Sequence, residues 1–360
     1  MSSNSTQSCS RSLERSASEI VLQLLGELQP VGSELREIVE KGCLRSLDAR
    51  TIIEWTISGK SAQNNSAISR TIIPSRFISA TENQFEKIEL EGLAPHFREM
   101  LSHFGAIFLE LCGNENQRRS AEKWSSAGER GVFLMTDAGG AVLANWLSVL
   151  KEESGRTDLV IDKIDSIEGH TAHFAIVAAR RGHSPLPIFF LLPPEQLASL
   201  RREAVGASWL DGSFRLANVV GRVEVNAECI LAAGGLSTAS LFLTIVRPRF
   251  VRALLAYLNW LERFRRIVRT GPQQAASRNL KIIAETASAR NRFSGSTIDE
   301  VSAIKFASNE LILDIVTSAS VTDARDRRDL LGFTKMEGSS YRCLFEVLEK
   351  RRKRHGKSSP

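Results

Sequence analysis

The sequence predicts an α+β protein in which a domain of short strands lies between two helical domains. From residue 16 to residue 130 the apolar residues recur at steps of three and four, which is the spacing of an amphipathic helix. From residue 131 to residue 231 they form short runs separated by Gly, Pro, Asp and Ser, which is the pattern of successive strands. Helical spacing returns between residues 232 and 348. The predicted order is therefore helical, then β, then helical.

The N-terminal helical domain, 16–130, begins with a recognisable helix start. Ser16 and Glu19 form a capping box ahead of "IVLQLLGEL". The polar stretch "SGKSAQNNSAISR" at 58–70 is rich in helix breakers and predicts a loop. Further on, five apolar residues share one face of a predicted helix that Gly113 can end. They are Phe97, Leu101, Phe104, Phe108 and Leu111.

The middle domain, 131–231, contains five runs with the character of strands. They are "GVFLMT", "DLVIDKI", "HFAIVAAR", "PIFFLLP" and "FRLANVVGRVEV". Short strands at this spacing, without helical patterns between them, favour an antiparallel barrel or sandwich. A Rossmann unit is not expected, because its parallel strands are joined by helices.

The C-terminal domain, 232–348, is predicted to be a helical bundle. Long helical patterns occur in "LSTASLFLTIVRPRFVRALLAYLNWLERF" and in "VSAIKFASNELILDIVTSA". In the second, Ile304, Leu311 and Ile315 share a face with Ala307 or Ser308. The apolar surface of these helices predicts association with a second chain.

Short polar segments flank the three domains. Residues 1–15 lack the apolar core of a secretory signal, so we expect a disordered lead-in. Residues 349–360 include the basic run "KRRKRHGK", which contributes much of the formal charge of +6. We interpret this tail as solvated, with contact to nucleic acid or to a phosphorylated ligand as the alternatives. Because the run has no interleaved aromatic residue, no nucleic-acid partner is predicted.

Composition excludes several other classes of protein. With 42% hydrophobic and 24% charged residues, the chain is expected to be globular. Its longest apolar runs fall short of the roughly 18 to 20 residues that span a bilayer, so no membrane segment is predicted. The 5 cysteines occur singly, which favours a reducing cytoplasm. No metal is predicted, because His170 and His173 have no carboxylate at helical spacing.

Four segments occur in the order that is found in one enzyme family. "LCGNENQRRSAEKWSSAGERGVFLMTDAGG" at 111–140 is similar to a family stretch that ends in Thr-Glu-Pro-Gly. "IEGHTAHFAIVAAR" at 167–180 and "FRLANVVGRVEVNAECIL" at 214–231 resemble two of its strands. "RDLLGFTKMEGSS" at 328–340 matches its Arg-Asp, six residues, Tyr-Glu-Gly-Thr without a gap. From about residue 93 to residue 345 the chain thus resembles the acyl-CoA dehydrogenases.

This resemblance implies a fold and a reaction. The fold is an N-terminal α-helical domain, a middle β-domain and a C-terminal four-helix bundle. The reaction is α,β-desaturation of an acyl thioester, carried by CoA or by an acyl-carrier protein, with FAD as the cofactor. Glu337 would be the base that removes the α-proton while the β-hydride passes to the flavin. Gly338 and Arg247 would lie at the substrate.

The resemblance also assigns cofactor residues and partners. The isoalloxazine ring would lie near four residues, and one of two arginines would reach the FAD phosphates. The ring residues are Thr136, Gly139, Gly140 and Ser166, and the arginines are Arg266 and Arg269. The implied partners are an electron acceptor such as an electron-transfer flavoprotein, and further subunits of the same or a related chain.

Several cofactor motifs of the family are altered in this sequence. "TDAGGAVL" stands where the family has Thr-Glu-Pro-Gly-Ala-Gly-Ser-Asp, and "IDSIEG" stands where it has Trp-Ile-Thr/Ser. "RRIVRTGPQ" lacks the family's Phe, and "DIVTSASVTDARDRRD" lacks its Gly-Gly segment. These changes leave an alternative function, which is a non-catalytic acyl-CoA-dehydrogenase-like subunit that scaffolds an active partner.

Residue types alone also allow a structural interpretation of the same positions. Thr136 would end a strand, and Gly139 and Gly140 would be turn glycines with positive φ. The Arg-Asp pair at 328–329 would be solvated, and Glu337 would be a surface carboxylate.

Overall fold

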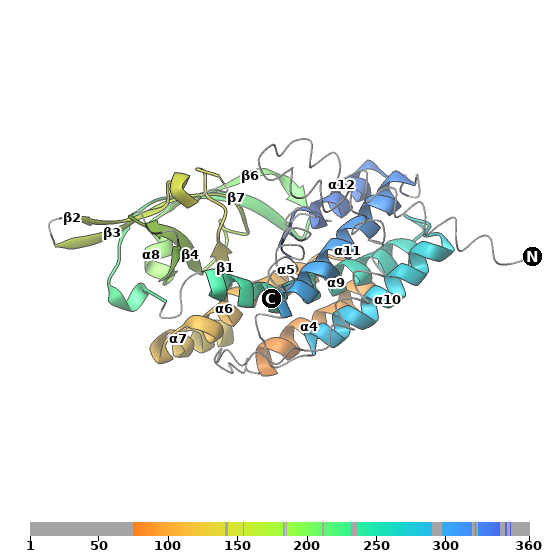
Figure 1. Ribbon diagram of the computed structural model, residues 1–360, viewed down its shortest axis with the longest axis horizontal. Helices are drawn as coiled ribbons and strands as arrows, with labels where there is room; N and C mark the ends of the chain where they lie inside the picture. The colour runs from red at the N-terminus through yellow and green to blue at the C-terminus, as the bar shows by residue number, and fades with distance from the viewer. Residues whose placement is uncertain are drawn as a thin grey trace, which may run out of the picture. The chain divides into compact units, whose positions relative to one another are not determined.

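The computed structural model divides the described chain into two compact units (Figure 1). The N-terminal unit contains the described residues from Ser75 to Val246, and the C-terminal unit contains Arg247–Arg290 and the described residues from Thr297 onward. The predictions for residues 1–15, 16–19, 58–70 and 349–360 lie outside the described residues, and the predicted domain boundaries stay predictions. The structure describes residues 75–338 except 141–142, 154, 183, 185, 211, 232–235, 290–296, 319–320 and 322, and also residues 343 and 346.

The N-terminal unit begins with four helices. They are α4 (Ser75–Glu91), α5 (His96–Ser102), α6 (Phe104–Cys112) and α7 (Glu115–Ser126). We predicted a single helix around Phe104. This prediction is wrong, because the helix is interrupted at His103, the residue between α5 and α6. The apolar spacing continues across this break, so periodicity alone does not reveal it. α7 starts at a complete capping box formed by Asn114 and Gln117.

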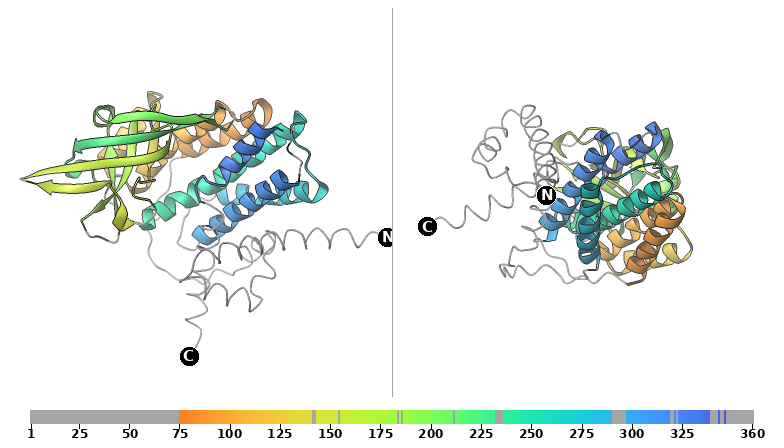
Figure 2. Two further views of the ribbon diagram at one scale, coloured as in Figure 1. Left: turned by 90° about the horizontal axis from the view of Figure 1, so that it is seen from above. Right: turned by 90° about the vertical axis from the view of Figure 1, so that its right-hand side faces the viewer.

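The strands of this unit form one seven-stranded sheet in the order β1-β4-β2-β3-β7-β6, with β5 paired to β4 (Figures 1 and 2). Among the described residues, every strand lies between Gly131 and Glu224, as the periodicity predicts. Two pairings, β1 with β4 and β2 with β4, are parallel, whereas we expected antiparallel pairing throughout. The strands are β1 (Gly131–Leu134), β2 (Val149–Glu153), β3 (Arg156–Ile167), β4 (Phe174–Arg181), β5 (Pro187–Leu192), β6 (Arg201–Trp209) and β7 (Phe214–Glu224), with a short helix α8 (Pro194–Ala198) between β5 and β6.

An aromatic cluster joins α6 to the sheet. The ring of Phe108 on α6 lies 4.8 Å from Phe133 on β1 and 5.3 Å from Phe189 on β5, between ring centroids. Phe242, at the start of the next long helix, lies 4.9 Å from the same ring. Burial of such rings supplies much of the apolar area that stabilises a core. The predicted helix face around Phe104 and Phe108 is therefore core, as its spacing indicates.

The C-terminal unit consists of helices packed along one another (Figure 2). They are α9 (Leu236–Arg263), of which the part from Arg247 belongs to this unit, α10 (Gly271–Ser288), α11 (Thr297–Thr317) and α12 (Ala324–Phe333). The predicted face of Ile304, Leu311 and Ile315 is buried. The opposite side of α11 is buried as well, so that even its charged residues Lys305 and Glu310 lie in the interior.

Candidate active site

Glu337 lies in a tight turn that follows the end of α12. Its backbone has a φ of 55°, in the left-handed region that residues other than glycine rarely adopt. A side chain in this region costs free energy, and the conformation persists only where neighbouring groups hold it. Here Arg247 Nε donates a hydrogen bond to the backbone oxygen of Glu337 at 2.8 Å. The matched motif therefore coincides with a strained, externally fixed turn.

Gly338 is required at its position by both conformation and space. Its φ is 121°, and a Cβ atom there would lie 2.9 Å from both Arg247 Nη2 and Cys343 Sγ. We expected this glycine to let the backbone approach a ligand. The close approach that the structure shows is to side chains of the same chain.

Two cationic side chains stand beside Glu337. Burial raises the pKa of the Glu337 carboxyl, and the charges of Arg247 and Lys305 offset part of that increase. Burial also opposes the charge on Arg247, yet Cys343, Glu346 and Glu337 together hold its pKa above the usual value. The partly buried carboxylate is thus not the surface group that residue type alone would indicate.

Arg247 is fixed by contacts within the C-terminal unit. Its Nη1 donates to Ser302 Oγ at 2.7 Å and to Glu346 Oε2 at 2.6 Å, and only 1% of the residue is exposed. These bonds supply the charge-assisted partners that a buried guanidinium needs. Contact between Arg247 and a substrate stays a prediction, whereas its support of Glu337 is a feature of the structure.

Lys305 belongs to this site and was missed by the sequence analysis. It is 2% exposed, and its Nζ donates to the backbone oxygen of Phe333 at 2.7 Å and to Asn309 Oδ1 at 2.5 Å. Burial lowers its pKa to about 8, even though Cys343 and Glu337 favour the charged form. The available signal was a lysine among apolar residues within one helix, which by itself equally fits a solvent-facing position.

In the Arg-Asp pair of the same motif Arg328 is exposed but Asp329 is buried, so the interpretation of a solvated pair holds only for the arginine. The side chain of Asp329 is fully buried and accepts hydrogen bonds from Arg328 at 2.9 and 3.0 Å. A buried carboxylate needs such partners, because desolvation disfavours its charge. Arg328, the preceding residue of α12, supplies two such hydrogen bonds to Asp329 in the helix that leads to Glu337.

The two predicted phosphate-binding arginines are each paired with a carboxylate. Arg266 Nε donates to Asp326 Oδ2 at 2.8 Å, and the side chain of Asp326 is fully buried. Arg269 Nη2 contacts Glu262 Oε2 at 2.5 Å and Asn259 Oδ1 at 2.7 Å. Burial opposes the charge of Glu262, but hydrogen bonds from Arg269 and Gln274 outweigh it and lower its pKa.

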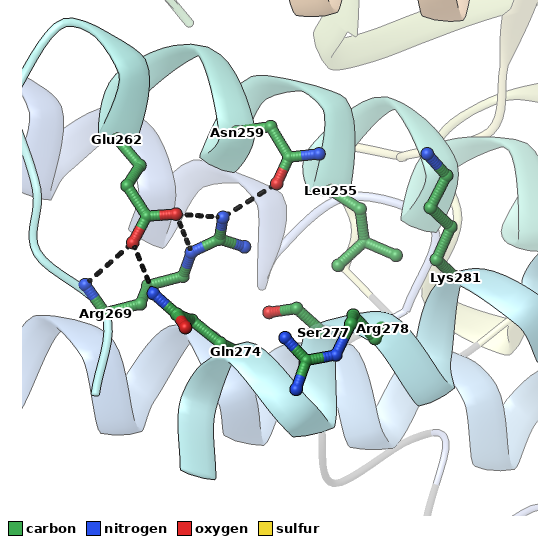
Figure 3. Close-up of a pocket in the computed structure, with 8 residues that line it drawn as sticks. All are labelled: Leu255, Asn259, Glu262, Arg269, Gln274, Ser277, Arg278 and Lys281. Carbon is green, nitrogen blue, oxygen red and sulfur yellow. Dashed lines mark hydrogen bonds and ion pairs between the residues drawn. The ribbon is translucent and has the colours of Figure 1, made fainter. Parts of the chain in front are cut away.

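Arg269 lines a cavity of about 320 Å³ between α9 and α10 (Figure 3). In Figure 3 its guanidinium group is held between Glu262 and Asn259. The other lining residues are Leu255, Gln274, Ser277, Arg278 and Lys281. The volume is at the lower end of the range for ligand pockets.

The predicted ring-binding residues all lie in the N-terminal unit. Thr136, at the end of β1, is exposed, and its backbone oxygen accepts a hydrogen bond from Ile164 N at 3.2 Å. This bond joins Thr136 to β3 at Ile164, two residues before Ser166. Ser166 is buried, and its hydroxyl faces the backbone oxygen of Ile164 at 3.5 Å.

The two glycines of "TDAGG" have different roles. Gly140 has a φ of 90° and open space around it, as expected of a turn glycine. Gly139 does not have positive φ, and a Cβ there would lie 1.9 Å from the backbone oxygen of Asn145. Gly140 is therefore needed for its backbone conformation, and Gly139 is needed for close packing of the loop on itself.

Asp137, between Thr136 and these glycines, organises the loop and was also missed. Its carboxylate accepts from Gly139 N at 2.9 Å and from Leu147 N at 2.7 Å, and Lys163 Nζ lies 3.1 Å away. Both charged side chains are fully buried, and Lys163 also lies over the ring of Trp146. The hydrogen bonds outweigh burial and lower the pKa of Asp137.

These observations test how well the residues fit FAD. Thr136 and Gly140 are both exposed, four positions apart in the same loop, and are compatible with contact to a flavin ring. Gly139 and Ser166 are already engaged within the N-terminal unit. Arg266 and Arg269 can bind a pyrophosphate only by exchanging their carboxylate partners. The ring half of the predicted site therefore fits better than the phosphate half.

Two other features bear on the class of protein. Among the residues that the structure describes, no three His, Cys, Asp or Glu side chains are grouped as metal ligands. Within the same part of the chain, no helix has the length and apolar character of a membrane span.

Comparison with known proteins places this fold. No family model and no curated protein matches the sequence. Among solved structures, butyryl-CoA dehydrogenase from Megasphaera elsdenii is 14% identical, with a TM-score of 0.60 over 78% of this chain and 91% of that chain. FkbI, for biosynthesis of the methoxymalonyl extender unit of the polyketide FK520, is 13% identical, with a TM-score of 0.62 over 87% and 94%.

A third similar structure is the prolyl acyl carrier protein oxidase AnaB. It is 12% identical, with a TM-score of 0.55 over 84% of this chain and 97% of that chain. The TM-scores over most of each chain establish similarity of fold, at low sequence identity. The chain has the acyl-CoA dehydrogenase fold, and its sequence is divergent.

Proposed function

We propose that this protein is a flavin-dependent dehydrogenase that introduces an α,β-double bond into an acyl thioester. The observation that supports this most strongly is the turn at Glu337. The glutamate at the position of the family's base has its backbone oxygen held by Arg247, is followed by an obligatory glycine, and has a carboxyl with a raised pKa. A surface carboxylate needs none of these features.

In this reaction Glu337 accepts the α-proton of the thioester on its carboxylate. The α-carbon is a weak acid, so a base with a raised pKa is better matched to it than an ordinary glutamate. The positive charges of Arg247 and Lys305 favour the ionised carboxylate and so oppose part of the increase in pKa that burial causes.

FAD, when bound, supplies the acceptor for the β-hydride. Thr136 and Gly140 would hold its ring, and Arg266 or Arg269 would reach its phosphates after exchanging partners. The substrate would be carried by CoA or by an acyl-carrier protein, and the electrons would leave to a protein such as an electron-transfer flavoprotein. We further propose a cytoplasmic oligomer of this chain or of this chain with a relative.

Replacement of Glu337 by glutamine tests the proposed base. Glutamine is nearly isosteric with glutamate but does not accept the proton, so turnover is expected to fall by about 10²- to 10⁴-fold. Flavin reduction by acyl-CoA and acyl-carrier-protein substrates would be followed under anaerobic conditions, with flavin content and circular dichroism checked in parallel. Glu203→Gln, at an exposed position of β6, is the matched control. Retention of more than about a tenth of the activity would exclude Glu337 as the base.

A second candidate function is a non-catalytic subunit that scaffolds an active relative. It is favoured by the ion pairs that engage Arg266 and Arg269, since these consume the charges that a pyrophosphate needs. The absorption spectrum of the purified protein distinguishes the two functions. Flavin bands that are bleached by an acyl thioester support the enzyme, whereas a colourless protein that sediments with an active dehydrogenase supports the scaffold.

A further inference from the structure

The turn that carries Glu337 is held by three side chains that all bind backbone oxygens. Lys305 Nζ binds the oxygen of Phe333 at 2.7 Å, where α12 ends. Arg247 Nε binds the oxygen of Glu337 at 2.8 Å. Asn309 Nδ2 binds the oxygen of Gly338 at 3.3 Å. The segment is therefore fixed at its beginning, at Glu337 and immediately after it.

Two of these three side chains form one unit on α11. Lys305 and Asn309 are one helical turn apart, and the lysine donates to Asn309 Oδ1 at 2.5 Å. That bond orients the amide so that its nitrogen faces Gly338. Lys305 thus acts on both ends of the turn, directly at Phe333 and through Asn309 at Gly338.

A buried lysine in this place has a free-energy cost. Both of its acceptors are neutral oxygens, and an apolar side chain of similar length would avoid the desolvation of an ammonium group. The charged and titratable groups that face it are Arg247 from α9, Glu337 from the turn, and Cys343 beyond the turn. Only Glu337 among these gains from a nearby positive charge in the way that a catalytic base requires.

We propose that Lys305, together with Asn309, is a positioning residue for Glu337. The pair fixes the turn through Phe333 and Gly338, and the positive charge of Lys305 favours the ionised form of the Glu337 carboxyl. This inference rests on the proposed function of Glu337 as the base. The two side chains have different roles. Lys305 provides a positive charge near Glu337 and hydrogen bonds that fix the turn, whereas Asn309 provides hydrogen bonds only.

The test compares three variants on α11 in the full chain. Lys305→Met removes the charge and the hydrogen bonds that Nζ donates to Phe333 and Asn309. Asn309→Ala keeps the charge but removes the hydrogen bond to Gly338 and the side-chain acceptor of Lys305. Ser308→Ala is the matched control, because Ser308 is equally buried but its hydroxyl donates to the backbone oxygen of Lys305. If Lys305→Met does not fold, Lys305→Gln takes its place. Thermal unfolding establishes that each variant is folded.

Two readouts separate charge from geometry. The first is infrared titration of the Glu337 carboxyl, taken as the difference from Glu337→Gln. The second is the pH profile of kcat and KM for an acyl thioester. Loss of the charge in Lys305→Met is expected to move the carboxyl titration and the acid limb of kcat upward by about one pH unit. Asn309→Ala is expected to lower kcat about 10-fold, with little change in KM or in the position of the limb.

The infrared readout does not depend on turnover. The proposed function of the protein and the proposed role of Lys305 can therefore be refuted independently of each other. A wild-type protein without activity but with a titration that moves in Lys305→Met overturns the proposed function and supports the coupling between the two groups. A folded Lys305→Met or Lys305→Gln variant with the wild-type titration overturns the role of Lys305. If Ser308→Ala changes kcat as much as Asn309→Ala does, the role of Asn309 is overturned.

Discussion

Replacement of Gly338 by alanine tests the geometry of the Glu337 turn. The φ of 121° lies in a region that an alanine adopts only with strain, at a cost of about 1 to 3 kcal/mol. The added methyl group would also lie 2.9 Å from Arg247 Nη2 and from Cys343 Sγ. Because Arg247 is fixed by Ser302 and Glu346, it cannot withdraw cheaply, and overpacking adds about 1 to 3 kcal/mol. We expect a total loss of about 2 to 6 kcal/mol of stability.

The matched control is Gly155→Ala, in the turn between β2 and β3. Gly155 also has a positive φ, of 78°, but nothing lies within 4 Å of an added Cβ. That variant measures conformational strain without the contact to Arg247. Chemical denaturation of both variants would give the difference, which we expect to be about 1 to 3 kcal/mol. Equal losses in the two variants would refute the argument that Arg247 and Cys343 close the space at Gly338.

Three further predictions concern charge. Glu262→Gln is expected to free Arg269 and to tighten FAD binding about 10-fold, measured by flavin fluorescence, and weaker binding would show that Arg269 is not a phosphate ligand. Lys163→Met removes the only buried cation that the structure pairs with Asp137 in the described residues and is expected to cost about 2 to 4 kcal/mol in denaturant unfolding, where a loss below about 1 kcal/mol would contradict the importance of the buried pair. Burial raises the pKa of Glu337, so the stability that the protonated carboxyl contributes is lost as pH rises through its folded-state pKa. Glu337→Gln is therefore expected to melt higher than the wild type above that pH, and a lower melting temperature there would contradict the direction of the shift.

Hydrophobic periodicity is local, and it correctly predicts the order of elements. The run of short apolar stretches from residue 131 places all the strands of the described chain between Gly131 and Glu224, and the helical spacing on either side corresponds to α4–α7 and α9–α12. The gapless motif around Glu337 identified the candidate base. Periodicity does not register the break at His103, because the apolar residues keep their spacing on both sides of it.

Only the tertiary structure shows which groups Arg247 and Lys305 contact. Arg247 and Glu337 are 90 positions apart, and Lys305 and Phe333 are 28 apart, so no local pattern joins them. A lysine on a helix is ordinarily solvated, and only the burial of α11 on all sides turns Lys305 inward toward the turn. The sequence also supplied two arginines for a pyrophosphate, of which Arg266 obtains the distant carboxylate of Asp326 on α12, whereas Arg269 pairs with Glu262 seven positions earlier. The sequence thus determines which residue types are present and which faces are apolar, whereas charge pairing depends on distances that exist only after the helices have packed.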